Sequence, residues 1–358
     1  MRGFCYVVLF FSAVIYAQSQ ESGNQNFNSI YGHALRGEMK EVFSLLDEFD
    51  EERLTPTQLE RKEAYNQRFR FRNEAFDYPT NQKDMVDLYQ RFANYWHSIL
   101  IEEVTQNLAD SLFRLEMAYF LKERDELTID IDSIQSNMVA FFDRFLEGRA
   151  YYGLVFGKTG HLHDLYVWGK ESEEVYDISL PETDVEVPVV FMENFVSNGW
   201  AHYTTFGYAY SGGWVGAEKI YCVKDAYDIE SENFLVSYVA HESQHFVDLA
   251  KYPNLKQVDL EYRAKLCELS LAETSLYSLI RKFEGFKKDD VENAHAYANY
   301  MIITQLTSKF FSGKGEVNSG NWEEVSSTDI NKYARKLLKE NSKELKKAGT
   351  GVETILLK

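Results

Sequence analysis

The chain reads Val239-Ala240-His241-Glu242-Ser243-Gln244-His245 inside a segment, 231–252, whose pattern predicts a helix. Residues four apart lie one above the other on a helix, so the imidazoles of His241 and His245 can reach the same metal ion. Glu242 projects beside them, where it can act on a metal-bound water. The spacing therefore predicts a catalytic site with one Zn²⁺ per chain. The alternative is a surface helix with two solvated histidines.

A zinc site of this kind needs a third protein ligand. A second helix is expected over 258–283, and on it Glu261 and Glu268 share one sector that apolar residues border on both sides. A carboxylate in such surroundings must be paired or must coordinate a metal. Either glutamate is a candidate ligand on this reasoning.

The two segments together resemble the gluzincin class of zinc metallopeptidases, through His241-Glu242-x-x-His245 and the following Glu261-x-x-Ala264. The resemblance covers about 199–283. It implies that His241, His245 and Glu261 are the metal ligands and that Glu242 is the general base in peptide-bond hydrolysis. The class often carries a carboxylate four residues after the ligand glutamate, where this chain has Lys265, and Glu268 stays open as the alternative ligand.

The resemblance also implies a group that stabilises the oxyanion of the reaction, commonly a downstream His or Tyr. His295 is the candidate for this catalytic role; the alternative is a helix histidine packed against Tyr297 and Tyr300. In the resembling peptidases the substrate lies along an edge strand, which would place it against 203–223. Asp248 is expected either to orient a ligand histidine or to be solvated near the helix end.

The rest of the chain has a block organisation. Residues 18–150 are expected to be helical, with helices at about 33–49, 56–71, 82–125 and 131–147. Short alternating stretches at 151–157, 165–169, 185–191, 203–210 and 219–223 predict a small sheet within 151–228. Helical segments return after it, including the C-terminal part 284–358. We therefore expect an α+β fold, with a helical N-terminal region, a small and mostly antiparallel sheet, and a zincin-like helical catalytic core over 151–358.

The N-terminus is typical of a secretory signal peptide, residues 1–17. Arg2 is followed by an uncharged and mostly apolar run over 4–17, too short to span a bilayer, with a cleavage site expected near Ala17. No later stretch approaches the length of a transmembrane segment. The protein is therefore expected to be secreted or periplasmic. In that compartment Cys222 and Cys267 could form a disulfide, or both could be buried thiols.

Charge narrows the class of partner. The 358 residues contain 38 Lys and Arg against 56 Asp and Glu, a formal net charge of −18. Such an acidic chain has no electrostatic attraction to phosphate backbones, so nucleic acid is not expected as a partner, whereas a peptide or small amide substrate is. The alternatives are a zinc hydrolase of a non-peptide amide and a non-catalytic zinc-containing binding protein. Glu242 favours catalysis, because metal binding alone does not require that base. Substrate preference and oligomeric state do not follow from the sequence.

Overall fold

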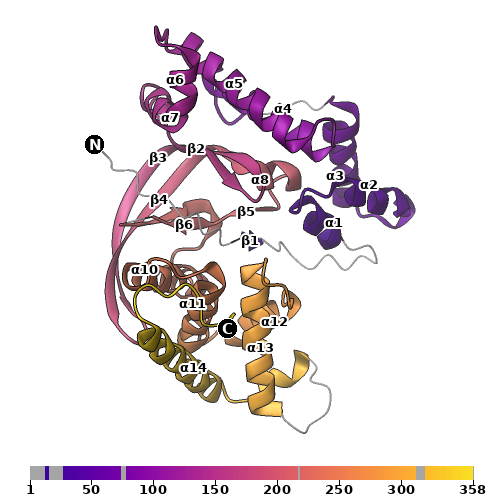
Figure 1. The fold of residues 1–358 in the computed structure, drawn as a ribbon. Coiled ribbons are helices and arrows are strands. Elements are labelled where there is room, and N and C mark those ends of the chain that lie inside the picture. Colours follow the sequence, from indigo (N-terminus) through magenta and orange to yellow (C-terminus); the bar gives the residue numbers. More distant parts are fainter. Residues whose placement is uncertain (1–12, 16–26, 74–77, 217, 312–318, 358) are drawn as a thin grey trace. The chain divides into compact units, whose positions relative to one another are not determined.

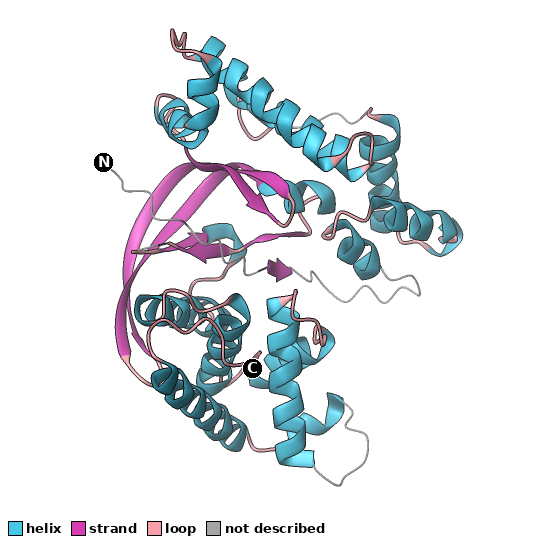
Figure 2. Ribbon diagram, in the orientation of Figure 1, coloured by secondary structure: helices cyan, strands magenta, loops and turns pink. Residues whose placement is uncertain are grey.

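The computed structural model of the protein describes residues 13–15, 27–73, 78–216, 218–311 and 319–357 (Figure 1). Helices predominate among these residues, and their strands form one sheet of five and one of two, so the fold is mixed α/β (Figure 2). No helix among these residues is long and apolar enough to cross a membrane. The predicted signal segment, 1–17, lies outside the described residues except for β1 (Ala13–Ile15), which pairs antiparallel with β5 (Ala209–Ser211).

The chain forms two compact units. Unit 1 comprises the described residues within Glu173–Phe191 and Gly213–Lys358, and unit 2 comprises those within Phe11–Ser172 and Met192–Gly212. Strands β3 (Leu162–Ser179) and β4 (Asp184–Asn198) each run from one unit into the other. Each unit is described below by itself.

Unit 2 contains most of the N-terminal helices. They are α1 (Phe27–Ala34), α2 (Met39–Glu48), α3 (Pro56–Tyr65), α4 (Lys83–Leu100), α5 (Gln106–Arg124), α6 (Ile131–Ser136) and α7 (Met138–Glu147). Thr55 caps α3 in a capping box, because its hydroxyl accepts the Gln58 amide at 3.3 Å while the Gln58 side chain accepts the Thr55 amide at 3.0 Å. The helix expected over 82–125 is two helices, interrupted where Glu102 has a φ of +58°.

The five-stranded sheet has the order β2-β3-β4-β7-β6. The remaining strands are β2 (Tyr152–Thr159), β6 (Gly213–Val215) and β7 (Ile220–Val223), and the β2–β3 and β6–β7 pairs are antiparallel. The prediction of a strand over 203–210 is wrong for most of its length: helix α8 (Gly199–Thr205) covers its first three residues, and only 209–210 belong to a strand, β5. The buried Asp164 carboxylate accepts the Trp200 amide at 2.8 Å in the first turn of α8, and this long-range cap favours the helix.

Unit 1 is built around α11 (Gln257–Leu271), which lies beside α10 (His241–Lys251), α13 (Ala294–Phe311) and α14 (Ser327–Ala348) (Figure 1). Every residue of α11 from Val258 to Ser270 is buried, including its charged ones. A helix that neighbours cover all round has no solvent face, so each of these charges must find a partner inside the protein.

The helix expected over 258–283 is broken into α11 and α12 (Leu276–Gly285). Ala272 is extended, and the amides of Glu273, Thr274 and Ser275 donate to the carboxylate of Glu232. A side chain from a helix remote in sequence therefore satisfies the amides of the turn that precedes α12, and no glycine or proline marks the break.

Candidate metal centre

The helix that carries the two histidines has three parts. It begins as α9 (Glu232–Phe234), where the Ser231 hydroxyl accepts the Phe234 amide at 3.1 Å, as expected for an N-cap. It continues as a π-helical segment, Leu235–Ala240, and becomes α10 at His241. Single π turns inside α-helices often occur at functional sites, and this one lies directly before the first histidine.

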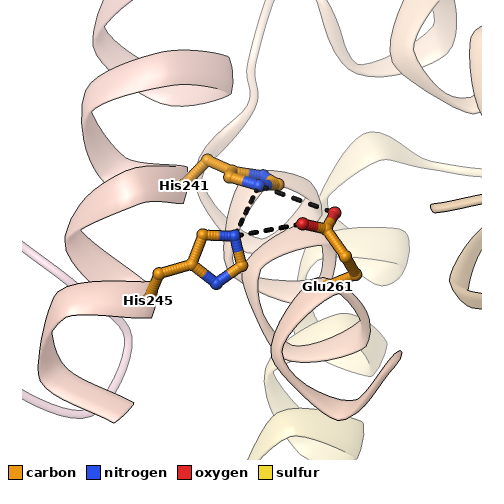
Figure 3. Close-up of side chains that lie close together, drawn as sticks. All are labelled: His241, His245 and Glu261. Carbon is orange, nitrogen blue, oxygen red and sulfur yellow. Dashed lines mark hydrogen bonds and ion pairs between the residues drawn. The ribbon is translucent and has the colours of Figure 1, made fainter. Parts of the chain in front are cut away.

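His241, His245 and Glu261 converge on one buried point (Figure 3). The Nε2 atoms of the two histidines are 3.0 Å apart. The Glu261 carboxylate lies 3.2 Å from His245 Nε2 through Oε1 and 3.7 Å from His241 Nε2 through Oε2. In the part of the chain that the structure describes, this is the group of His, Cys, Asp and Glu side chains able to hold a metal ion.

The donor set and its dimensions fit zinc. Two imidazole nitrogens and one carboxylate oxygen are ligands that zinc prefers, and bonds of about 2.0–2.1 Å around a tetrahedral ion separate the ligand atoms by about 3.3 Å. The three separations here, 3.0, 3.2 and 3.7 Å, lie on both sides of that value. A three-ligand set also leaves the fourth position for water or substrate.

Glu268, the alternative third ligand, lies on the other side of His241. Its Oε1 is 2.6 Å from His241 Nδ1, the ring nitrogen that faces away from the triad. A carboxylate in this position fixes the orientation and tautomer of the imidazole, so that Nε2 is the nitrogen presented to an ion. The structure thus brings Glu261 into the triad and places Glu268 behind it.

Two further side chains contact the Glu261 carboxylate. His295 Nδ1, from the first turn of α13, is 2.7 Å from Oε2, and Lys265 Nζ is 3.8 Å from the same oxygen. Glu261 is 2% exposed, whereas the side chain of His295 is 41% exposed, so His295 lies toward solvent from the triad. Lys265 was not predicted to belong to the site, although its i,i+4 spacing from Glu261 was a signal for the pair.

Burial and the neighbouring charged groups have opposite effects on the pKa values of the triad side chains. Burial opposes the charged form of His241, but the nearby Glu268 and Glu261 carboxylates outweigh it and raise the pKa of His241 to about 10. Burial likewise disfavours the charged form of Glu261, yet His295 and the two triad histidines hold the pKa of Glu261 well below its ordinary value. The buried carboxylates of Glu261 and Glu268 must be compensated by positive charge, which either protons on the histidines or a bound metal ion can supply.

Glu242 is completely buried in the first turn of α10. Burial, and to a smaller extent the nearby Glu242, raises the pKa of the Cys222 thiol. Cys222 and Cys267 are both buried free thiols, and the possible disulfide between them is not formed.

Neither prediction for Asp248 is correct. Its carboxylate forms a bidentate ion pair with Arg263, in which Arg263 Nε donates to Oδ2 at 2.8 Å and Arg263 Nη2 donates to Oδ1 at 2.9 Å. Both side chains are buried. Asp248 therefore joins α10 to α11 and does not orient a ligand histidine.

No protein-family model, curated protein or solved structure matches this chain.

Proposed function

We propose that this chain is an exported, zinc-dependent metallopeptidase of the gluzincin type, with a zincin-like catalytic core in unit 1. The observation that supports the proposal most is the buried triad of His241, His245 and Glu261, with Glu242 between the two histidines on one helix turn. His241, His245 and Glu261 would hold one Zn²⁺ per chain. When bound, zinc supplies a Lewis acid that polarises a carbonyl and lowers the pKa of a water from about 16 to near 7.

Glu242 is the proposed general base. Its carboxylate would take the proton of the attacking water and pass it to the leaving amine. Glu268 would hold His241 in the tautomer that presents Nε2. His295 remains the candidate for stabilising the oxyanion, since it reaches the ligand carboxylate while its side chain stays partly open to solvent.

An extended peptide is the proposed substrate, paired with the edge of the sheet at β6. This strand is last in the sheet order and packs against α10, the helix with both histidines. Strand addition at such an edge holds a substrate backbone by main-chain hydrogen bonds and explains how the scissile carbonyl would reach the triad.

Zinc content and peptide cleavage, measured on the same samples, test the proposal. We expect about one zinc per chain in the wild type and in Glu242→Gln, and a loss of zinc in His245→Ala. Cleavage of a mixed peptide library should be seen with the wild type and fall by about 10²-fold or more in Glu242→Gln, because only the base is removed. N-terminal sequencing of the exported protein should begin near Gln18.

Each alternative has its own outcome. Zinc without peptide cleavage, but with Glu242-dependent hydrolysis of acyl-amino acids, would indicate a non-peptide amidase. Zinc without hydrolysis of either substrate class would indicate a binding protein. Absence of zinc from all three proteins, after reconstitution with added metal, would refute the proposed function.

A further inference from the structure

Lys265 is a buried cation within the proposed metal centre. It follows Glu261 by one turn of α11, its Nζ is 3.8 Å from Glu261 Oε2, and its side chain is 10% exposed. The ammonium also lies 4.8 Å from the centre of the Phe283 ring, which is itself buried. The ion pair and the aromatic face together hold the positive charge in place against the ligand carboxylate.

A positive charge held 3.8 Å from the ligand carboxylate weakens the binding of a divalent ion to that carboxylate. The centre would have one carboxylate ligand, Glu261, one carboxylate behind a ligand, Glu268, and the buried Glu242 beside the histidines, so few negative charges attract the metal. Lys265 cancels part of this negative charge. In a buried site the effective dielectric constant is low, so the electrostatic interaction between charges a few ångströms apart is strong.

We propose that Lys265 is a resident cation that competes with the metal for Glu261 and so keeps the centre exchangeable. In the metal-free protein the ammonium is one partner of the buried carboxylate, beside His245 and His295, which contact it more closely. When an ion binds, the same charge repels it and lowers the affinity. The inference rests on the proposed metal centre, but it is independent of whether the centre hydrolyses peptides.

The competing explanation is structural: Lys265 could simply stabilise α11 through an i,i+4 pair with Glu261. The two explanations predict opposite effects on metal affinity. A merely structural lysine, once removed, would leave the zinc affinity unchanged or reduce it. A competing cation, once removed, must increase it.

The test is the zinc dissociation constant of the full chain, measured by competition with a chromogenic chelator. Lys265→Met and Lys265→Gln should each bind Zn²⁺ about tenfold more tightly or better than the wild type. Lys265→Arg, which keeps the cation, should bind within a few-fold of the wild type. Glu268→Gln is the matched control with the opposite sign, since loss of a carboxylate behind a ligand histidine weakens metal binding about 10–100-fold.

Circular dichroism identifies the variants that fold. Two neutral variants, Lys265→Met and Lys265→Gln, are used so that the test does not depend on the folding of either one. Unchanged or weaker zinc binding in the folded neutral variants would overturn the inference, as would the absence of zinc binding in the wild type. Tighter binding in a protein that cleaves no peptide would support the inference while the proposed function failed. The two conclusions can therefore be separated.

Discussion

At Gly213 the backbone of β6 lies directly against Tyr238 and β7. A Cβ at this position would overlap the Tyr238 hydroxyl and the Tyr221 carbonyl, and the φ of +151° is one that L side chains rarely adopt. Tyr238 itself donates to Tyr221 O at 2.6 Å. The contact ties the edge of the sheet to the π-helical segment before His241, so its geometry bears on the site.

We therefore predict that Gly213→Ala destabilises the protein by about 2–4 kcal/mol, through overpacking and backbone strain. Urea unfolding followed by circular dichroism measures the loss. Gly285→Ala is the control, because an added Cβ there meets nothing within 4 Å, and its free energy of unfolding should stay within about 0.5 kcal/mol of the wild type. Equal stability of the two variants would contradict the prediction.

At the scale of elements, the buried pair of Asp248 and Arg263 fixes α10 against α11. Arg263 Nη1 also donates to Asn341 Oδ1 and Ser342 Oγ in α14, both at 2.9 Å, so a single guanidinium connects three helices. The pair is buried, and the loss of one partner would leave a desolvated charge behind.

Asp248→Leu is predicted to cost about 3–5 kcal/mol, because Arg263 stays buried with only the partly exposed Glu182, 3.9 Å away, as a counter-charge. The double variant Asp248→Leu/Arg263→Met should lose less than the single variant, since no buried charge is left unpaired. Chemical denaturation of the two variants and the wild type decides the matter. A double variant less stable than the single one would show that the stranded charge is not the cause.

Glu232 connects the start of α9 to the start of α12. Burial opposes its ionisation, but the hydroxyls of Thr274 and Ser275 and the amides that donate to it lower its pKa to about 2, from an ordinary value of 4.5. Because the folded pKa is below the unfolded one, the carboxylate stabilises the fold above about pH 4.5, and this stabilisation is lost as the pH falls from about 4.5 to 2.

Glu232→Gln should therefore have a lower melting temperature than the wild type at pH 6, and the difference should shrink steadily as the pH is lowered to about 3. Thermal scans of both proteins across this range provide the measurement. A difference that grew on acidification would mean that the carboxylate is not charged in the fold.

At the scale of the whole molecule, the proposed ligands all belong to unit 1. A ligand that binds only the folded state stabilises it, by about 4 kcal/mol when its free concentration is a thousand times the dissociation constant. Zinc is therefore expected to protect the elements that supply the triad, and to affect unit 2 less.

Hydrogen exchange with mass spectrometry, with zinc and with EDTA, tests this expectation. Protection of amides in α10 and α11 should rise on zinc binding, while α4 and α5 of unit 2 should change little. His245→Ala should show no zinc effect in either unit. An increase spread evenly over both units would contradict the prediction.

Features with local causes could be predicted from the sequence. The Thr55-Pro56 helix start, the Ser231 cap and the i,i+4 placement of His241 and His245 all depend on residues within a turn or two of one another. The strand expected over 203–210 and the unbroken helix over 258–283 were wrong for the opposite reason. Asp164 and Glu232, each remote in sequence, supply the caps that override the local pattern.

The sequence by itself determined a helix with two histidines on one face and a following helix with two candidate carboxylates. Glu261 and Glu268 are two turns apart, about 10.5 Å along α11, so they cannot occupy the same position opposite the histidines. Only the packing of α10 on α11 decided that Glu261 joins the triad and that Glu268 lies behind His241. The face of a helix is set by its local period, whereas the height at which two helices meet depends on the side chains packed between them.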